Sequence, residues 1–548
     1  MSGRRSEAVP RRTRIARACL PATALAVVVA VVTAACADSR PVAASGPHRQ
    51  LLRPGPTVHV AQGALRGRYA RGAQEFLDVP YAAPPVGRRR FAPPAPPARW
   101  PGVRGAQHHG PACVQWYFNP PSLPSGTPTS EDCLHLDVYA PRDARPGARL
   151  PVLFFIHGGG NVQGSGILFG GERFARLGDA LMVSINYRLG PDGWLALPEL
   201  RGPDGVGNDG LLDQLRALRW VRRNIAAFGG DPQRITIDGQ SAGSESVCDL
   251  LSTPLARGLF QRAILESGPC TYRTPDPPAS AEALGRQFAG EVGCTRPAQV
   301  VACLRRVPTS RLVAAAQIDP VAGEVTGTRA LPVPPERAIR TGRWNRVPLI
   351  IGTTRDEAKL FEIDRPDLSA GDYVATVRGE WGRHANAVLA RYPLSRYPSP
   401  FYALAAVETD SGTACYSYWM ARETAAQVPT FEEEFDDPTS PTLRGFQPPG
   451  IDMANAHAAE LAYLFDYRLV ARPLTPPELA LGARMDRYWG HFAATGDPGV
   501  AGQVPWPRMT PGDPRVIELR TSHTVVSSTG FASEHRCAFW ATLEPRST

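Results

Sequence analysis

Continuous apolar runs alternate with a helical pattern through the middle of the chain. Residues 151–156, 180–187, 263–265 and 348–352 are apolar runs of strand length. Between them, residues 210–221 carry apolar side chains at helical spacing. Buried strands that alternate with helices are typical of a mostly parallel sheet covered by helices. The pattern therefore predicts an α/β fold.

The flanking segments have different patterns. Short strand-like runs occupy residues 58–60 and 63–67, whereas the proline-dense residues 79–102 are expected to form a loop packed on the domain. Residues 272–345 and 362–430 have helical patterns that prolines interrupt. We expect these two segments to be helical insertions that line a functional site.

One short segment carries the pattern of a catalytic nucleophile. The β-branched run 235–237 leads into Gly-Gln-Ser-Ala-Gly at residues 239–243, and residues 244–251 can continue as a helix. A strand-to-helix turn of this kind exposes the hydroxyl of Ser241 and aims the following N–H groups at the same point. Because G-x-S-x-G also arises by chance, the surrounding sequence decides whether Ser241 is catalytic.

A glycine loop precedes this segment. His157 and the three glycines at 158–160 directly follow the predicted strand 151–156. Consecutive glycines let backbone N–H groups approach a ligand oxygen without a Cβ in the way. The N–H groups of Gly159, Gly160 and Ala242 would together form an oxyanion hole, in which losing one donor typically costs about 2.7–4 kcal/mol. The alternative is a glycine-rich turn without a role, and the downstream G-x-S-x-G pattern argues against it.

A serine nucleophile needs a base, and the base needs an acid to orient it. His457 follows the last sheet-like run and is the candidate base, because in such hydrolases the chain order is serine, acid, histidine. Asp356 and Glu357 both follow the strand-like run 348–352, and the pattern alone leaves both open as the acid. His457 and Glu460 lack an H-E-x-x-H pattern and a second ligand cluster, so neither a metal nor an organic cofactor is predicted.

The N-terminal residues have the features of an export signal. An arginine-rich segment precedes an apolar run at residues 18–35 that a proline interrupts. A short, interrupted run favours a signal peptide over a membrane-spanning helix. We predict a signal peptide at 1–36, a flexible linker at 37–56 and one α/β domain at 57–548. Cys36 loosely matches a bacterial lipobox, so a lipoprotein tethered to the membrane through Cys36 and a freely secreted protein both stay open.

Charge and cysteine content fit an exported domain. Six arginines and one glutamate fall in residues 1–36, so +5 of the net charge of +9 lies there and +4 remains for the rest. So small a charge, without basic runs interleaved with aromatics, argues against nucleic-acid binding. Eight of the ten cysteines lie beyond residue 36, an even number that can pair in an oxidising compartment.

Many dispersed motifs together resemble the type-B carboxylesterases, the family that includes cholinesterases and bacterial para-nitrobenzyl esterases. The resemblance runs from Val58 to Trp540. Besides the Gly-Gln-Ser-Ala-Gly segment and the glycine loop, the matching motifs are Pro80-Tyr81-Ala82, Pro84-Pro85-Val86-Gly87, Ser130-Glu131-Asp132-Cys133-Leu134, Phe228-Gly229-Gly230-Asp231-Pro232, Glu266-Ser267-Gly268, Thr495-Gly496-Asp497-Pro498 and Cys537-Ala538-Phe539-Trp540. The resemblance implies an α/β-hydrolase fold, with a mostly parallel central sheet flanked by helices and helical insertions around the active site.

Carried over position by position, the resemblance also implies the site residues. The catalytic triad is then Ser241, Glu357 and His457, with Glu357 rather than Asp356 as the acid. The implied oxyanion donors are Gly159, Gly160 and Ala242.

The resemblance implies three disulfides, Cys113–Cys133, Cys294–Cys303 and Cys415–Cys537. It leaves Cys248 and Cys270 either as a fourth pair or as two buried thiols. One departure from the family concerns Asn161, which follows the glycine loop where an aromatic residue is common. We therefore expect that wall of the pocket to be more polar.

The prediction is an exported serine carboxylesterase that acts on a small-molecule ester through an acyl-enzyme intermediate. Lipase, amidase or thioesterase activity on the same triad is the alternative, because specificity depends on loops that the sequence pattern does not define. A non-catalytic binding protein on the same scaffold is disfavoured, because all three triad residues are present. The sequence does not indicate an oligomeric state.

Overall fold

The computed structural model describes residues 55–115, 123–271, 275–316 and 323–543. The predicted signal peptide at 1–36, including Cys36, and residues 37–54 of the predicted linker lie outside the described residues. The described residues belong to one compact unit, Pro54–Thr548. None of the helices in the described ranges is long and apolar enough to cross a membrane.

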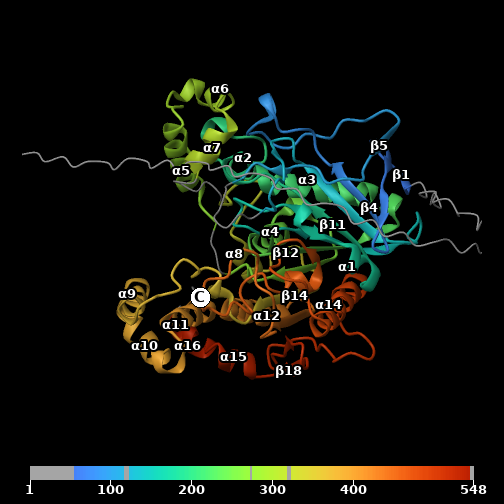
Figure 1. Ribbon diagram of the computed structural model, residues 1–548. Coiled ribbons are helices and arrows are strands. Elements are labelled where there is room, and N and C mark those ends of the chain that lie inside the picture. The colour runs from blue at the N-terminus through green and yellow to red at the C-terminus, as the bar shows by residue number, and fades with distance from the viewer. Residues whose placement is uncertain (1–54, 116–122, 272–274, 317–322, 544–548) are drawn as a thin grey trace, which may run out of the picture. The chain divides into compact units, whose positions relative to one another are not determined.

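An 11-stranded mixed sheet forms the centre of this unit (Figure 1). Its parallel part runs from β11 to β17, and antiparallel strands extend it at both edges. The predicted mostly parallel α/β sheet is therefore confirmed. In spatial order the strands are β18 (Val525–Ser527), β17 (Val516–Leu519), β15 (Thr430–Phe435), β14 (Leu349–Thr354), β13 (Arg262–Glu266), β12 (Gly230–Gln240), β9 (Leu150–Ile156), β11 (Leu181–Ile185), β8 (His135–Pro141), β4 (Ala73–Pro80) and β3 (Arg68–Ala70).

Helices bury both faces of this sheet, which explains why its central strands are continuously apolar. Along β9, Val152, Phe154 and Ile156 belong to one hydrophobic core, and Leu153 and Phe155 belong to the opposite core. The first core includes apolar residues of α3 and α4, and the second includes those of α1 and α14. These helices are α1 (Glu172–Leu177), α3 (Asp209–Asn224), α4 (Ala242–Ser252) and α14 (Pro476–Thr495).

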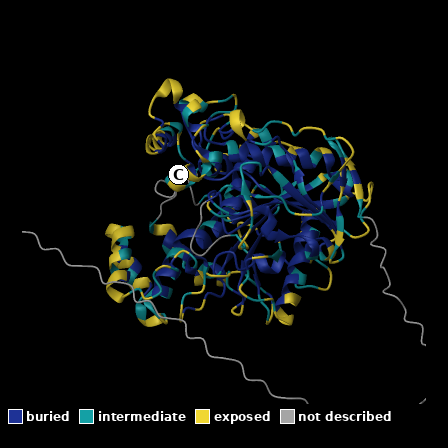
Figure 2. Cartoon of the chain, turned by 45° about the horizontal axis from the view of Figure 1, so that its top comes forward, coloured by how far each residue is buried: buried dark blue, intermediate teal, exposed yellow. Residues whose placement is uncertain are grey.

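The two predicted insertions are largely helical. Figure 1 shows α5–α7 at the upper left and α9–α11 at the lower left, and Figure 2 shows exposed residues on the outer helices around a buried sheet. The helices are α5 (Pro278–Glu291), α6 (Val300–Leu304), α7 (Thr309–Ala316), α8 (Pro335–Arg340), α9 (Ala370–Trp381), α10 (Ala385–Arg391), α11 (Pro400–Thr409) and α12 (Cys415–Ala425). The remaining elements include α2 (Gly190–Trp194), α13 (Leu461–Leu464), α15 (Gly530–Glu534), α16 (Cys537–Leu543), and the small sheets β1 (Thr57–Val60) with β2 (Gly63–Arg66) and β5 (Val103–Gly105), β6 (Ala112–Cys113) with β7 (Thr129–Ser130), and β10 (Phe169–Gly170) with β16 (Asp466–Tyr467).

The predicted loop at 79–102 begins later than expected. Val79 and Pro80 are the last two residues of β4 and pair with Leu136 and His135 of β8 after a register shift. Pro80 is tolerated there because it ends the strand, and the next amide, that of Tyr81, donates to the carbonyl of Leu134. A further short 3₁₀ helix occupies Gly87–Arg89.

Four disulfides cross-link the unit. They join Cys113 to Cys133, Cys248 to Cys270, Cys294 to Cys303, and Cys415 to Cys537. The first, third and fourth are those that the family resemblance implied, and Cys248 and Cys270 form the remaining pair rather than two thiols. Cys415–Cys537 spans 122 residues and ties the C-terminal helix α16 to α12.

Candidate active site

The turn between β12 and α4 holds Ser241 in a strained backbone conformation. Its φ is 58° and its ψ is −128°, a region that residues other than glycine rarely occupy and that costs on the order of 1–3 kcal/mol. A Cβ on Gly243 would collide with the backbone of Ile156, and one on Gly239 would collide with the backbone of Gly243. The two glycines of the motif are therefore required by close packing, which lets the turn present Ser241 at the end of the sheet.

Glu357 and His457 form a buried pair beside this turn. His457 Nδ1 lies 2.5 Å from Glu357 Oε2, and the other carboxylate oxygen accepts hydrogen bonds of 2.8 Å from Thr353 Oγ1 and the Thr354 amide. Burial opposes the charge of Glu357, but His457 and the hydrogen bonds, one of them from Ser267, outweigh it and lower the pKa of the carboxyl. Glu357 therefore stays ionised and orients the imidazole.

Asp356 is directed elsewhere. Its carboxylate forms an ion pair with Lys359 at 3.0 Å, and its side chain is 37% exposed. The two carboxylates that the sequence pattern left open thus have different partners. Only Glu357 contacts His457.

The opposite nitrogen of the imidazole faces the β12–α4 turn. His457 Nε2 lies 3.1 Å from Nε2 of Gln240, the residue that precedes Ser241. Among the described residues, Gln240 rather than Ser241 is at hydrogen-bonding distance from this nitrogen. Ser241 and His457 both line the same cavity, so the structure brings the three predicted triad residues together.

The glycine loop lies against the turn that carries Ser241. Gly159 has a φ of 104° and Gly160 a φ of 62°, values that favour glycine. Within the described part of the chain, the amides of these two glycines donate no backbone hydrogen bond, and both residues line the cavity with Ser241. Ala242 is the first residue of α4, so its amide is among those that a helix leaves without an intrahelical partner.

Asn161 does not contribute a polar wall to the cavity, contrary to the expectation from the sequence. It is fully buried, and its Nδ2 donates to Glu324 Oε1 at 2.6 Å. Its carbonyl accepts the Gly190 amide at 2.7 Å. Tyr187 reinforces this arrangement by donating from its hydroxyl to the carbonyl of His157 at 2.8 Å. Asn161 and Glu324 thus fix the end of the glycine loop, which sequence motifs did not reveal because 163 residues separate them.

His157 itself is not part of the triad. It is buried, and burial lowers its pKa to about 4, so the ring is neutral at neutral pH. Its Nδ1 pairs with the carbonyl of Gly158 at 2.8 Å, and its ring stacks on Tyr187. His157 therefore supports the loop.

The cavity in front of Ser241 has a volume of about 340 Å³. Its described lining includes aromatic and aliphatic residues and no Asp, Glu, Lys or Arg. The apolar lining residues are Val162, Leu168, Phe169, Leu360, Phe361, Leu443, Phe446, Ala458, Leu461, Tyr467 and Leu469. Such a surface suits an uncharged, apolar ligand.

Four buried carboxyl groups lie close to the Glu357–His457 pair, and sequence motifs did not single them out as a group. Asp238, Glu266, Glu433 and Glu460 are buried, and burial raises the pKa of each well above its usual value. Trp489 Nε1 donates to Glu266 at 2.9 Å. Burial therefore favours the neutral form of these four acids, whereas its partners favour the charged form of Glu357 beside His457.

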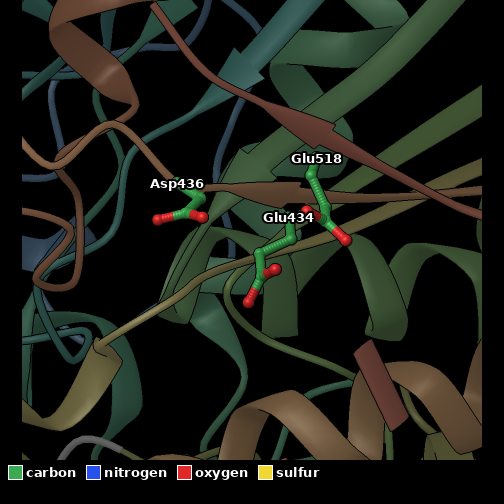
Figure 3. Close-up of side chains that lie close together, drawn as sticks. All are labelled: Glu434, Asp436 and Glu518. Carbon is green, nitrogen blue, oxygen red and sulfur yellow. The ribbon is translucent and has the colours of Figure 1, made fainter. Parts of the chain in front are cut away.

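Three other carboxylates lie close enough together to hold a metal ion, namely Glu434, Asp436 and Glu518 (Figure 3). Each of them already faces a cationic side chain. Glu434 pairs with His535, Asp436 with Arg355 and Arg520, and Glu518 with Arg520, at distances between 2.6 and 3.0 Å. We interpret this group as an ion-pair network.

Comparisons with known proteins agree with this geometry. The model of the carboxylesterase family matches residues 54–540. The chain is 33% identical to para-nitrobenzyl esterase of Bacillus subtilis (strain 168), over 82% of this chain and 92% of that protein, and 31% identical to cocaine esterase of Oryctolagus cuniculus, over 90% and 96%. A solved structure of a thermophilic PNB esterase superposes with a TM-score of 0.74 at 30% identity, covering 88% of this chain and 99% of that one. The chain therefore belongs to the carboxylesterase family and is a carboxylic ester hydrolase with the α/β-hydrolase fold.

Proposed function

We propose that the protein hydrolyses uncharged carboxylic esters through a Ser241–His457–Glu357 triad and an acyl-enzyme. The observation that carries the proposal is the buried His457–Glu357 pair, held at 2.5 Å, in the same cavity as Ser241 at its strained turn. Such an arrangement gives a serine hydroxyl the base that it needs to react at neutral pH.

In the first half of the reaction, His457 Nε2 accepts the proton of Ser241 Oγ as this oxygen attacks the ester carbonyl carbon. The N–H groups of Gly159, Gly160 and Ala242 stabilise the oxyanion that forms. His457 then donates the proton to the alkoxide oxygen, and the alcohol leaves. In the second half, His457 accepts a proton from water, which attacks the acyl group and releases the acid. Glu357 stays ionised throughout and stabilises the imidazolium.

The Ser241→Ala variant tests the nucleophile. We expect kcat for a short-chain nitrophenyl ester to fall by a factor on the order of 10⁶, because removing a triad nucleophile can cost that much. An organophosphate should label the wild-type protein at Ser241, as read by peptide mass spectrometry. Full activity of the variant, or a label on another residue, would contradict the proposed mechanism.

The apolar cavity supports a preference for uncharged acyl groups. With the nitrophenyl leaving group held constant, we expect kcat/KM to rise about fourfold for each methylene that enters the cavity, because burying one contributes about 0.8 kcal/mol. Esters that place a carboxylate or a quaternary ammonium in the acyl chain should react far more slowly. Matching amides and thioesters complete the panel, and a preference for either would replace the ester assignment.

We also propose that the protein is exported. The arginine-rich, then apolar, N-terminal sequence has the features of a signal peptide, and four disulfides suit an oxidising compartment. N-terminal analysis of the mature protein separates the two forms: a lipid on Cys36 identifies a lipoprotein, and an unmodified N-terminus identifies a secreted protein.

A further inference from the structure

We propose that Gln240 donates a hydrogen bond to the catalytic base and favours its neutral, proton-accepting form. The inference rests on the proposed triad. Its starting point is the 3.1 Å distance between Gln240 Nε2 and His457 Nε2, both in buried side chains that line the cavity.

The hydrogen bond at the other ring nitrogen indicates which atom is the acceptor in this contact. His457 Nδ1 donates to Glu357, so in the neutral ring Nε2 carries a lone pair. An amide nitrogen is a donor only and matches that lone pair. In the imidazolium form, Nε2 carries a proton, and the two donors would oppose each other.

The amide oxygen of Gln240 faces the glycine loop. Gln240 Oε1 lies on the side of Gly158, where a Cβ built on the glycine would be 3.1 Å away from it. With the ring neutral and its Nδ1 donating to Glu357, presenting Oε1 to His457 instead would place two lone pairs opposite each other. A hydrogen bond to the neutral form of a titrating group disfavours the charged form.

Other titratable groups also lie around the ring. Glu357 is the charged group that touches the ring. Glu266, Glu433 and Glu460 are buried acids, and burial raises the pKa of each, which favours their neutral forms. Burial lowers the pKa of His157 to about 4, so this ring is neutral at neutral pH. Asp356 and Lys359 neutralise each other in an ion pair. Among the described residues, Gln240 is the side chain that lies at hydrogen-bonding distance from Nε2.

Gln240 also competes with the nucleophile. The lone pair of Nε2 can accept one strong hydrogen bond, either from Gln240 or from Ser241 Oγ. In the free enzyme it accepts from Gln240, so the base exchanges this partner for Ser241 before the proton moves.

The test compares the wild type with Gln240→Glu and Gln240→Met. Glutamate has the same shape but brings a negative charge to Nε2, and an opposite charge within about 4–6 Å favours the charged form of a group by 1–3 pH units. We expect the pH at which kcat/KM reaches half its maximum, on the acidic side, to rise by about 1–3 units in Gln240→Glu. Methionine removes the donor, and the midpoint should rise in the same direction by less.

Gln163→Glu is the matched control, because Gln163 lines the same cavity without contacting His457 Nε2. We expect a smaller shift in this variant. Thermal unfolding of each variant shows whether it is folded, and Gln240→Met carries the test if Gln240→Glu is not.

A second measurement does not require turnover. The titration of the His457 ring, followed by NMR of histidine-labelled protein, should show the same order of midpoints. Unchanged midpoints in both Gln240 variants, or an equal shift in Gln163→Glu, would overturn the inference while leaving the esterase proposal intact. A wild-type protein that hydrolyses no ester would instead overturn the proposed function, and the ring titration would still decide the role of Gln240.

Discussion

Two neighbouring carboxylates show how the proposed chemistry depends on single residues. Asp356 and Glu357 are adjacent in sequence, yet Asp356 pairs with Lys359 at the surface and Glu357 pairs with His457 in the interior. Glu357 also receives two hydrogen bonds from Thr353 and Thr354. An oriented, ionised carboxylate is what an imidazole base requires.

The first residue-scale prediction compares Glu357→Gln with Asp356→Asn. We expect kcat to fall by about 10⁴ in Glu357→Gln, because an amide in the place of a triad acid can hold the imidazole in the wrong tautomer. Asp356→Asn should change kcat less than threefold, since only a partly exposed ion pair is lost. Steady-state kinetics on a nitrophenyl ester measures both. The reverse order of effects would show that Asp356 is the acid.

At the scale of elements, the sheet and the β12–α4 turn position the candidate site, and a hydrogen bond from a distant segment holds the glycine loop. Asn161 has a φ of 60° and follows Gly160 directly. Its side chain bonds to Glu324, which lies between α7 and α8 in the first helical insertion. We infer that this bond keeps the loop in the conformation in which its amides face the cavity.

Breaking this bond should therefore affect the transition state more than substrate binding. We expect Glu324→Gln to lower kcat modestly, since the amide can still accept a hydrogen bond, and Asn161→Ala to lower kcat by about 10–100-fold. KM should change little in both, because the oxyanion forms only during the reaction. Thermal unfolding is the accompanying control. A rise in KM at constant kcat would show that the pair shapes the binding pocket instead.

At the scale of the whole molecule, buried ion pairs and disulfides connect segments that are far apart in sequence. His535 bridges Asp410 and Glu434, each at 2.7 Å, close to the Cys415–Cys537 disulfide. Burial alone would lower the pKa of His535, but the two carboxylates raise it to about 10. The charged ring thereby connects the C-terminal segment to β15 and to the segment after α11.

This bridge predicts a pH-dependent stability. The pKa of His535 is raised in the folded protein, so its contribution is fully present below pH 6.5 and is lost as the pH rises through 10. We expect His535→Asn to lower the free energy of unfolding by about 3–5 kcal/mol at pH 6, and the difference from wild type to shrink towards pH 10. Denaturant unfolding at both pH values measures this. His523→Asn, at an exposed position, should show neither effect, and a constant difference in His535→Asn would exclude the charge as its cause.

The sequence alone predicted a large part of this protein. Continuous apolar runs require burial on both sides, which determines a mostly parallel sheet between helices. The G-x-S-x-G motif and the glycine loop are local patterns, because the close backbone contacts at Gly239 and Gly243 exclude other residue types at those positions. The chain order of serine, acid and histidine likewise came from the sequence, as part of the proposed triad, and the family match accounts for the fold.

The tertiary structure decided the contacts that no local pattern encodes. Gln240 meets His457 across 217 residues and Asn161 meets Glu324 across 163, so their pairing depends on how the sheet and the insertions fold. The separation of Glu357 from Asp356 depends on which side of the chain faces the interior. Burial and pairing then shift the charge equilibria, because exclusion of water favours the neutral form of a carboxyl such as Glu433 or Glu460, and a charged partner favours the ionised form of one such as Glu357.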